Sequence, residues 1–239
     1  MVSAEDYDEL VEYASRPPET VAEVERLAEL AAGGRVLELG AGTGRVAIPL
    51  AAKGPEVHAI ELDPAMIRQL RAKPGIERVI THLGDMTDMD VDGTFDLIFA
   101  VFGTLFMLPT QDDQVRCFRS AARRLAPNGK LVIEALIPQP TTYDQNRKVT
   151  VAHAADDRVV LNVSESDPVA QTIDTRHVVF SASGIEVHPV HVRYSWPSEL
   201  DLMARLAGLQ LRARWSDWDR RPFTAGDQRH ISVYQQPIE

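Results

Sequence analysis

Five short apolar runs, separated by stretches with helical spacing, constrain the fold of this 239-residue chain more than any other feature. The runs cover residues 35–39, 57–60, 79–82, 95–100 and 131–135. Apolar runs of this length between helices are typical of strands that are buried on both faces of a parallel sheet. The repeated strand–helix–strand order therefore predicts an α/β fold with a doubly wound sheet.

Helix start and stop signals fall where this order needs them. Asp63 followed by Pro64 is typical of a helix start, and Thr20 with Glu23 has the spacing of a capping box. The Pro-Asn-Gly segment at 127–129 predicts the end of one helix and a turn into the fifth strand. These signals support helices between the predicted strands.

Between residues 137 and 196 the apolar pattern changes from continuous to alternating. Alternation over 159–164 and β-branched residues over 172–180 and 185–194 predict an antiparallel meander of three or four strands. This meander is too short and too rich in strands to be an independent domain. We therefore expect one domain over 1–239 that carries residues 137–196 as an insertion after the fifth strand.

Cysteine content and hydropathy exclude several protein classes. The single cysteine, Cys117, excludes an intrachain disulfide framework and a cysteine-based structural zinc site. The spacing of histidines and carboxylates predicts no metal site. No apolar run is long enough to cross a bilayer, and residues 1–12 are acidic and lack the hydrophobic segment of a signal peptide. We expect a cytoplasmic protein without a membrane partner.

The most informative motif is a glycine turn between the first predicted strand and the following helix. Gly40, Gly42 and Gly44 allow positive φ angles and let a ligand approach the backbone near a helix N-terminus. Glu61 follows the second strand, where a carboxylate can accept hydrogen bonds from two ribose hydroxyls. A dinucleotide-binding pattern would need glycine at position 45, and Arg45 stands there instead. The turn therefore indicates a ribose-containing ligand and disfavours a dinucleotide.

From Glu38 onward the pattern Glu-x-Gly-x-Gly-x-Gly resembles motif one of the class I S-adenosylmethionine-dependent methyltransferases. The resemblance spans residues 36–135 and implies a Rossmann-like, seven-stranded sheet, mostly parallel with one antiparallel strand. It implies that the loop lies beneath the methionine portion of S-adenosylmethionine, that Glu61 holds the ribose and that Asp85 contacts the adenine amino group. The implied cofactor-binding residues are Glu38, Gly40, Ala41, Gly42, Gly44, Glu61, Leu62, Asp85, Met86, Ala100 and Phe102.

The insertion and residues 132–135 are similar to the branch of this family that methylates amino sugars and other small natural products. This resemblance implies transfer of a methyl group to an N, O or C nucleophile of a small molecule, with the insertion covering the acceptor side. Transfer from a sulfonium mainly requires alignment and exclusion of water, and it needs no metal. A hydroxyl acceptor would need a general base, whereas an amine must arrive unprotonated.

Three residues are candidates for the acceptor side. Glu134 interrupts an apolar run, which indicates either a structural ion pair or a carboxylate that orients or deprotonates the acceptor. Tyr143 follows the fifth strand, and His191 is favoured among the histidines of the insertion because it lies close to the return to the sheet. Tyr7 and Tyr13 are candidates for an amino-terminal lid or for surface packing.

The net charge and the distribution of arginines indicate whether the protein binds nucleic acid. The net charge of −10 argues against a large phosphate-contacting surface. Six arginines and two tryptophans between residues 205 and 230 can in principle clamp RNA, but three aspartates dilute the patch. We expect an ion-pair network or a rim for an anionic small acceptor, and no nucleic-acid partner.

Two alternatives stay open at this point: an NAD-dependent oxidoreductase, disfavoured by Arg45, and a non-catalytic cofactor-binding module of the same fold. The sequence leaves both a monomer and a homodimer possible.

Overall fold

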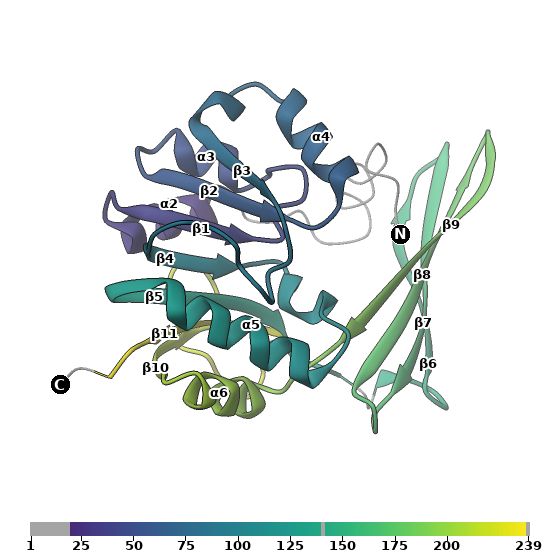
Figure 1. Ribbon diagram of the computed structural model, residues 1–239. Coiled ribbons are helices and arrows are strands. Elements are labelled where there is room, and N and C mark those ends of the chain that lie inside the picture. Colours follow the sequence, from purple (N-terminus) through teal and green to yellow (C-terminus); the bar gives the residue numbers. More distant parts are fainter. Residues whose placement is uncertain (1–19, 140–141, 238–239) are drawn as a thin grey trace. The chain divides into compact units, whose positions relative to one another are not determined.

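The computed structural model describes residues 20–139 and 142–237, and these fall into two compact units (Figure 1). We call Glu19–Ile137 with Trp196–Glu239 the sheet unit, and Pro138–Ser195 the meander unit. In the described residues no helix is both long enough and apolar enough to cross a membrane.

The sheet unit contains a seven-stranded sheet in the order β10-β11-β5-β4-β1-β2-β3. Its strands are β1 Arg35–Leu39, β2 Glu56–Glu61, β3 Val79–Leu83, β4 Phe95–Ala100, β5 Leu125–Leu136, β10 Gln210–Trp215 and β11 Arg229–Gln235. Strands β1 to β5 pair in parallel, whereas β11 is antiparallel to both of its neighbours. The predicted Rossmann-like fold and its single antiparallel strand are thus confirmed.

Helices connect β1 to β2, β2 to β3 and β4 to β5 as predicted, whereas residues 84–94 between β3 and β4 form no helix. The helices are α2 Thr20–Ala31, α3 Ala47–Ala51, α4 Pro64–Ala72, α5 Gln111–Arg124 and α6 Pro197–Leu206, with short 3-10 helices η1 Ile76–Arg78 and η2 Thr104–Met107. Asp63 caps α4, because its Oδ1 accepts the N–H of Ala65 at 2.7 Å. The carboxylate of Glu23, which was predicted to belong to a capping box, binds Arg45 of a different segment.

Strand β5 differs from its predicted bounds. It begins at Leu125, so the predicted turn at 127–129 lies inside the strand. Asn128 has a φ of +64°, and the pairing with β4 shifts register between Phe95 and Leu97. Turn-forming residues therefore produce an irregularity in the strand rather than a separate turn.

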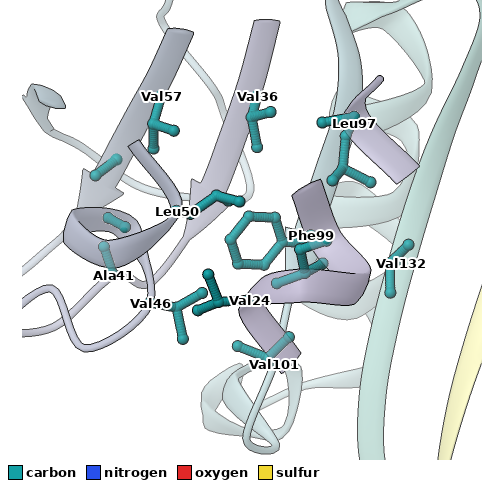
Figure 2. Packing of buried hydrophobic residues seen from close by; sticks show 14 of the residues in the cluster. Val24, Val36, Ala41, Val46, Leu50, Val57, Leu97, Phe99, Val101 and Val132 are labelled. Carbon is teal, nitrogen blue, oxygen red and sulfur yellow. The ribbon is translucent and has the colours of Figure 1, made fainter. Parts of the chain in front are cut away.

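The core covers both faces of the sheet. Figure 2 shows Val24 of α2 close to Phe99 of β4, and Val36, Leu97 and Val132 of the central strands belong to the same buried cluster. Both Phe99 and Val132 are fully buried. On the opposite face the ring of Phe118 in α5 meets Tyr234 of β11 edge to face, with centroids 5.7 Å apart. Burial on two faces explains why these strands are continuous apolar runs in the sequence.

The meander unit is a four-stranded antiparallel sheet in the order β6-β7-β8-β9. The strands are β6 Arg147–Ala154, β7 Arg158–Asp167, β8 Thr172–Ser181 and β9 Gly184–Arg193, and each pairs with the next along the chain. The predicted meander is confirmed with four strands. Val160 and Val179 share one face of this sheet and are buried. Val151 and Val187 lie on the other face, in one cross-strand row, and are more than half exposed.

Candidate cofactor and acceptor site

The glycine loop follows β1 and has a left-handed backbone at all three glycines. The φ angles are +63° at Gly40, +56° at Gly42 and +87° at Gly44, a region that favours glycine. A Cβ on Gly40 would lie 2.4 Å from Cγ2 of Thr104, at the start of η2. The loop therefore packs directly against the turn that follows β4, and a side chain on Gly40 would force Thr104 to shift.

Glu61, at the end of β2, is tied to this loop by its carboxylate. Its Oε2 accepts the N–H of Gly42 at 2.8 Å, and its Oε1 accepts the N–H groups of Leu62 and Asp63, both at 2.9 Å. A carboxylate has about four acceptor positions, so these three bonds leave capacity for a ligand hydroxyl. The position and chemistry of Glu61 fit a ribose.

Glu38 is a buried acid beneath the loop. Its pKa is raised to about 8, mainly by burial and also by the nearby charge of Glu23, while the charge of Arg45 opposes both effects. Its Oε2 is buried without a hydrogen-bond partner among the described residues. Such an oxygen is costly unless a donor reaches it. An ammonium group, like the one in the methionine portion of S-adenosylmethionine, would supply both a donor and a compensating charge.

Asp85 and Met86 follow β3 at the same edge of the sheet. The N–H of Gly84 donates to the backbone carbonyl of Glu61 at 2.9 Å, which holds the ends of β3 and β2 together. The Oδ1 of Asp85 accepts the N–H of Thr87 at 2.7 Å, and the residue is exposed. Asp85 is thus positioned by its own turn and accessible to an amino group.

Ala100, the last residue of β4, is fully buried, and Phe102 in the turn that follows is 38% exposed. The N–H of Phe102 donates to Oε2 of Glu134 at 2.8 Å. Oε1 of Glu134 lies 3.4 Å from Nη1 of Arg229 in β11. Glu134 is therefore a buried carboxylate with a backbone donor and an ion-pair partner, which matches the first of its two predicted interpretations.

Arg45 links the glycine loop to α2. Its Nη1 lies 2.5 Å from Oε2 of Glu23, and its guanidinium is 5.5 Å from the ring centroid of Phe102. Burial raises the pKa of Glu23 to about 7, opposed by the hydrogen bond and charge of Arg45. Glu23 and Arg229 were not predicted as parts of this site. No local pattern marks them, because they lie 22 and 95 residues from their partners.

The other two acceptor-side candidates belong to the meander unit. Tyr143 is half-buried, burial raises its pKa, and Nζ of Lys148 lies 5.7 Å from its ring centroid. His191 in β9 is largely exposed, and its Nδ1 is 2.8 Å from Oδ1 of Asp174. Their approach to the acceptor stays a prediction. Tyr7 and Tyr13 lie outside the described residues.

The carboxyl-terminal arginines form ion pairs, as expected. Arg214 pairs with Asp201 at 2.6 Å, and Arg221 pairs with Asp217 at 3.0 Å and with Asp227 at 2.9 Å. Among the described residues, no group of three or more His, Cys, Asp or Glu side chains is arranged to hold a metal.

Comparison with known proteins agrees with this geometry. The methyltransferase domain family matches residues 36–129. The cypemycin N-terminal methyltransferase of a Streptomyces species is 27% identical over 85% of this chain and 83% of its own length. The dTDP-4-amino-2,3,4,6-tetradeoxy-D-glucose N,N-dimethyltransferase of Saccharopolyspora spinosa is 30% identical over 75% of this chain and 72% of its own.

Among solved structures, the CcbJ methyltransferase from Streptomyces caelestis is similar to this chain with a TM-score of 0.92 and 40% identity. The match covers 98% of this chain and 96% of that protein. Since the similarity extends over nearly the whole length of both chains, it includes the meander as well as the sheet. The chain thus belongs to the small-molecule branch of the class I methyltransferases, enzymes whose cofactor is S-adenosylmethionine.

Proposed function

We propose that this enzyme methylates an amine of a small natural product, with an amino sugar as the leading class of acceptor. One similar protein is named as an N-terminal methyltransferase and another as an N,N-dimethyltransferase of an amino sugar. The contacts of Glu134 also support an amine acceptor. Its carboxylate already binds the Phe102 N–H and Arg229, so it is not needed as a general base for a hydroxyl. An amine that arrives unprotonated needs no general base for the displacement itself.

Residues of the sheet unit would hold the methyl donor. Glu38 would bind the ammonium group, Glu61 the ribose hydroxyls and Asp85 the adenine amino group. When bound, S-adenosylmethionine supplies a methyl group on a positively charged sulfur that leaves as a neutral thioether. The turn at Phe102 would align the acceptor and keep water out, which are the main requirements of an in-line displacement.

Tyr143 and His191 remain the candidates for direct contact with the acceptor. His191, with its Nδ1 held by Asp174, would take the proton that the amine releases once the new bond to carbon has formed. We keep the prediction that the meander covers the acceptor side of the enzyme. A His191→Ala variant tests the proposed role of His191 as proton acceptor. It should lower kcat and leave the affinity for S-adenosylhomocysteine unchanged.

A labelled-methyl assay tests the acceptor class. The enzyme and methyl-labelled S-adenosylmethionine are incubated with matched panels of amino sugars, phenols and neutral sugars, and with RNA. Label should enter amino sugars. Label in phenols or RNA would replace the amine proposal, whereas binding of S-adenosylhomocysteine without transfer to any acceptor would favour a non-catalytic module. Unchanged thermal stability with excess S-adenosylhomocysteine would contradict the cofactor assignment itself.

A further inference from the structure

Two consecutive residues in the turn after β4 have a left-handed backbone. The φ angle is +57° at Phe102 and +73° at Gly103. Glycine adopts this conformation freely, but a residue as bulky as Phe102 does so only when its surroundings impose it. Because the Phe102 side chain is 38% exposed, burial of the ring is incomplete. Polar contacts of the backbone are therefore needed to hold this turn.

Glu134 supplies two such contacts. Its Oε2 accepts the N–H of Phe102 at 2.8 Å, and its backbone carbonyl accepts the N–H of Gly103 at 3.3 Å. Strand β4 ends at Ala100, which pairs with Ile133, so Glu134 stands where the parallel ladder stops. The side chain of Glu134 thus continues the ladder by one more bond, into the left-handed turn.

Arg229 fixes the carboxylate that makes this bond. Its Nη1 lies 3.4 Å from Oε1 of Glu134, and its Nε donates to the carbonyl of Ser216 at 3.3 Å. Glu134 is only 7% exposed, and a buried carboxylate needs a compensating charge. Arg229 supplies that charge and leaves Oε2 directed to Phe102.

The held turn touches the cofactor loop at two points. The methyl group of Thr104 lies against Gly40, where an added Cβ would approach it to 2.4 Å. The Arg45 guanidinium lies 5.5 Å from the Phe102 ring centroid, within the range of a cation–π contact. A shift of the turn would therefore move the glycine loop.

We propose that Glu134 is a positioning residue for cofactor binding: it holds the Phe102–Gly103 turn against the glycine loop, and Arg229 holds Glu134. This assigns the carboxylate a role different from that of a general base for the acceptor. The inference depends on the cofactor of the family and is independent of the acceptor class. Its failure is therefore distinguishable from failure of the amine proposal.

The test compares Glu134→Ala with Glu134→Gln, using S-adenosylhomocysteine affinity measured by calorimetry. Glu134→Ala should weaken binding about 10-fold, because the Phe102 N–H loses its acceptor. Glu134→Gln should restore affinity to within about 3-fold, since the amide oxygen can accept the same bond. Glu77→Gln, an exposed acid of η1, is the matched control and should bind as the wild type does.

Two results would overturn the proposal. The first is that Glu134→Ala binds S-adenosylhomocysteine as tightly as the wild type does. This result is expected if Glu134 is a base that acts on the acceptor, because such a base does not touch S-adenosylhomocysteine. A 10-fold loss that glutamine does not restore would indicate that charge, rather than the bond to the turn, matters to the ligand.

A double-mutant cycle with Phe102→Gly tests the route through the turn. Glycine adopts the left-handed backbone without strain, so loss of the Glu134 carboxylate should cost about 3-fold or less on that background. Additive losses would contradict the inference. If Glu134→Ala does not fold, Glu134→Asp replaces it in the cycle: the shorter side chain keeps the charge but withdraws the acceptor, and the same coupling is expected.

Discussion

The two sheets of this enzyme use β-branched residues in opposite ways. In the seven-stranded sheet the valines of the central strands are fully buried, as at Val36 and Val132. In the four-stranded sheet Val149 and Val151 are 62% and 64% exposed, and one face of the sheet is apolar. The same residue types thus build a core in one unit and a surface in the other, and only the pattern along the chain separates the two cases.

The comparison extends to function. All eleven residues predicted to bind the cofactor lie in the sheet unit, whereas two of the three acceptor-side candidates lie in the meander unit. Cofactor recognition uses local spacing around one loop, which a sequence displays directly. Recognition of an acceptor depends on side chains from distant segments. If this division between the units is sharp, variants of the sheet unit should lose cofactor affinity and variants of the meander unit should keep it.

The largest effect is expected at the glycine loop. Gly40→Ala should lower S-adenosylhomocysteine affinity at least about 100-fold, because the left-handed φ and the collision with Thr104 together cost about 2–4 kcal/mol. The control is Gly184→Ala in β9, where φ is +135° but no atom lies within 4 Å of the added Cβ. That variant should lose stability and keep its affinity. Calorimetry that finds equal affinities for the two variants would show that the loop tolerates a side chain.

A smaller loss is expected at Glu61. Glu61→Ala removes the acceptor for three backbone N–H groups and for the ribose, and about 10- to 100-fold weaker S-adenosylhomocysteine binding should follow. Glu165→Ala, at an exposed acid of β7, serves as the meander control and should bind normally. An unchanged dissociation constant in Glu61→Ala, with a normal circular dichroism spectrum, would remove this residue from the site.

A moderate pH dependence should originate in the sheet unit. The pKa of Glu38 is raised from 4.5 to about 8 in the folded protein. Its contribution to stability is therefore complete below pH 4.5 and is lost as the pH rises through 8. A bound ammonium favours the ionised carboxylate, so S-adenosylhomocysteine affinity should rise over the same range.

Differential scanning calorimetry from pH 5 to 9 measures the expected fall in stability, and binding titrations over the same range measure the expected rise in S-adenosylhomocysteine affinity. Glu38→Gln is the control for both. Glu23, whose pKa is raised to about 7, and Arg45 lie close by, so the Glu38→Gln profile should be flatter rather than flat. Affinity that falls with rising pH would contradict an ammonium at Glu38.

The smallest effect is expected on the exposed face of the meander. Val151→Thr should change the free energy of unfolding by less than about 0.5 kcal/mol, whereas Val132→Thr in β5 buries a hydroxyl and should cost about 1–3 kcal/mol. Urea denaturation measures both. A cost above about 1 kcal/mol for Val151→Thr would mean that this face is covered in solution, which would weaken the contrast between the two sheets.

Much of the fold is predictable because its signals are local. The bounds 35–39 and 95–100 agree with β1 and β4, since each apolar run is bordered by turn residues or a change of pattern. The start of β5 was not predicted, because Asn128 adopts its left-handed φ within a paired strand. A turn signal in the sequence does not say whether hydrogen bonding to a neighbour continues across it.

The site was predictable to the same extent. Spacing marks the glycine loop and Glu61, and a charge within an apolar run marks Glu134. The partners that define what Glu134 does, Phe102 and Arg229, lie 32 and 95 residues away. The family resemblance implied Phe102 as a cofactor contact, but nothing in the sequence marked Arg229 or the pairing of either residue with Glu134. Their roles follow from strand order, which places β5 between β4 and β11.

That strand order also has a consequence for how the chain folds. Strand β11 pairs with β5 on one side and β10 on the other, yet it follows both along the chain. The large sheet therefore closes late during synthesis, through contacts between distant segments, whereas each hairpin of the meander can form as soon as its two strands exist. Arg229 arrives on that last strand, so the Glu134 ion pair beside the cofactor loop is completed only when the sheet itself is complete.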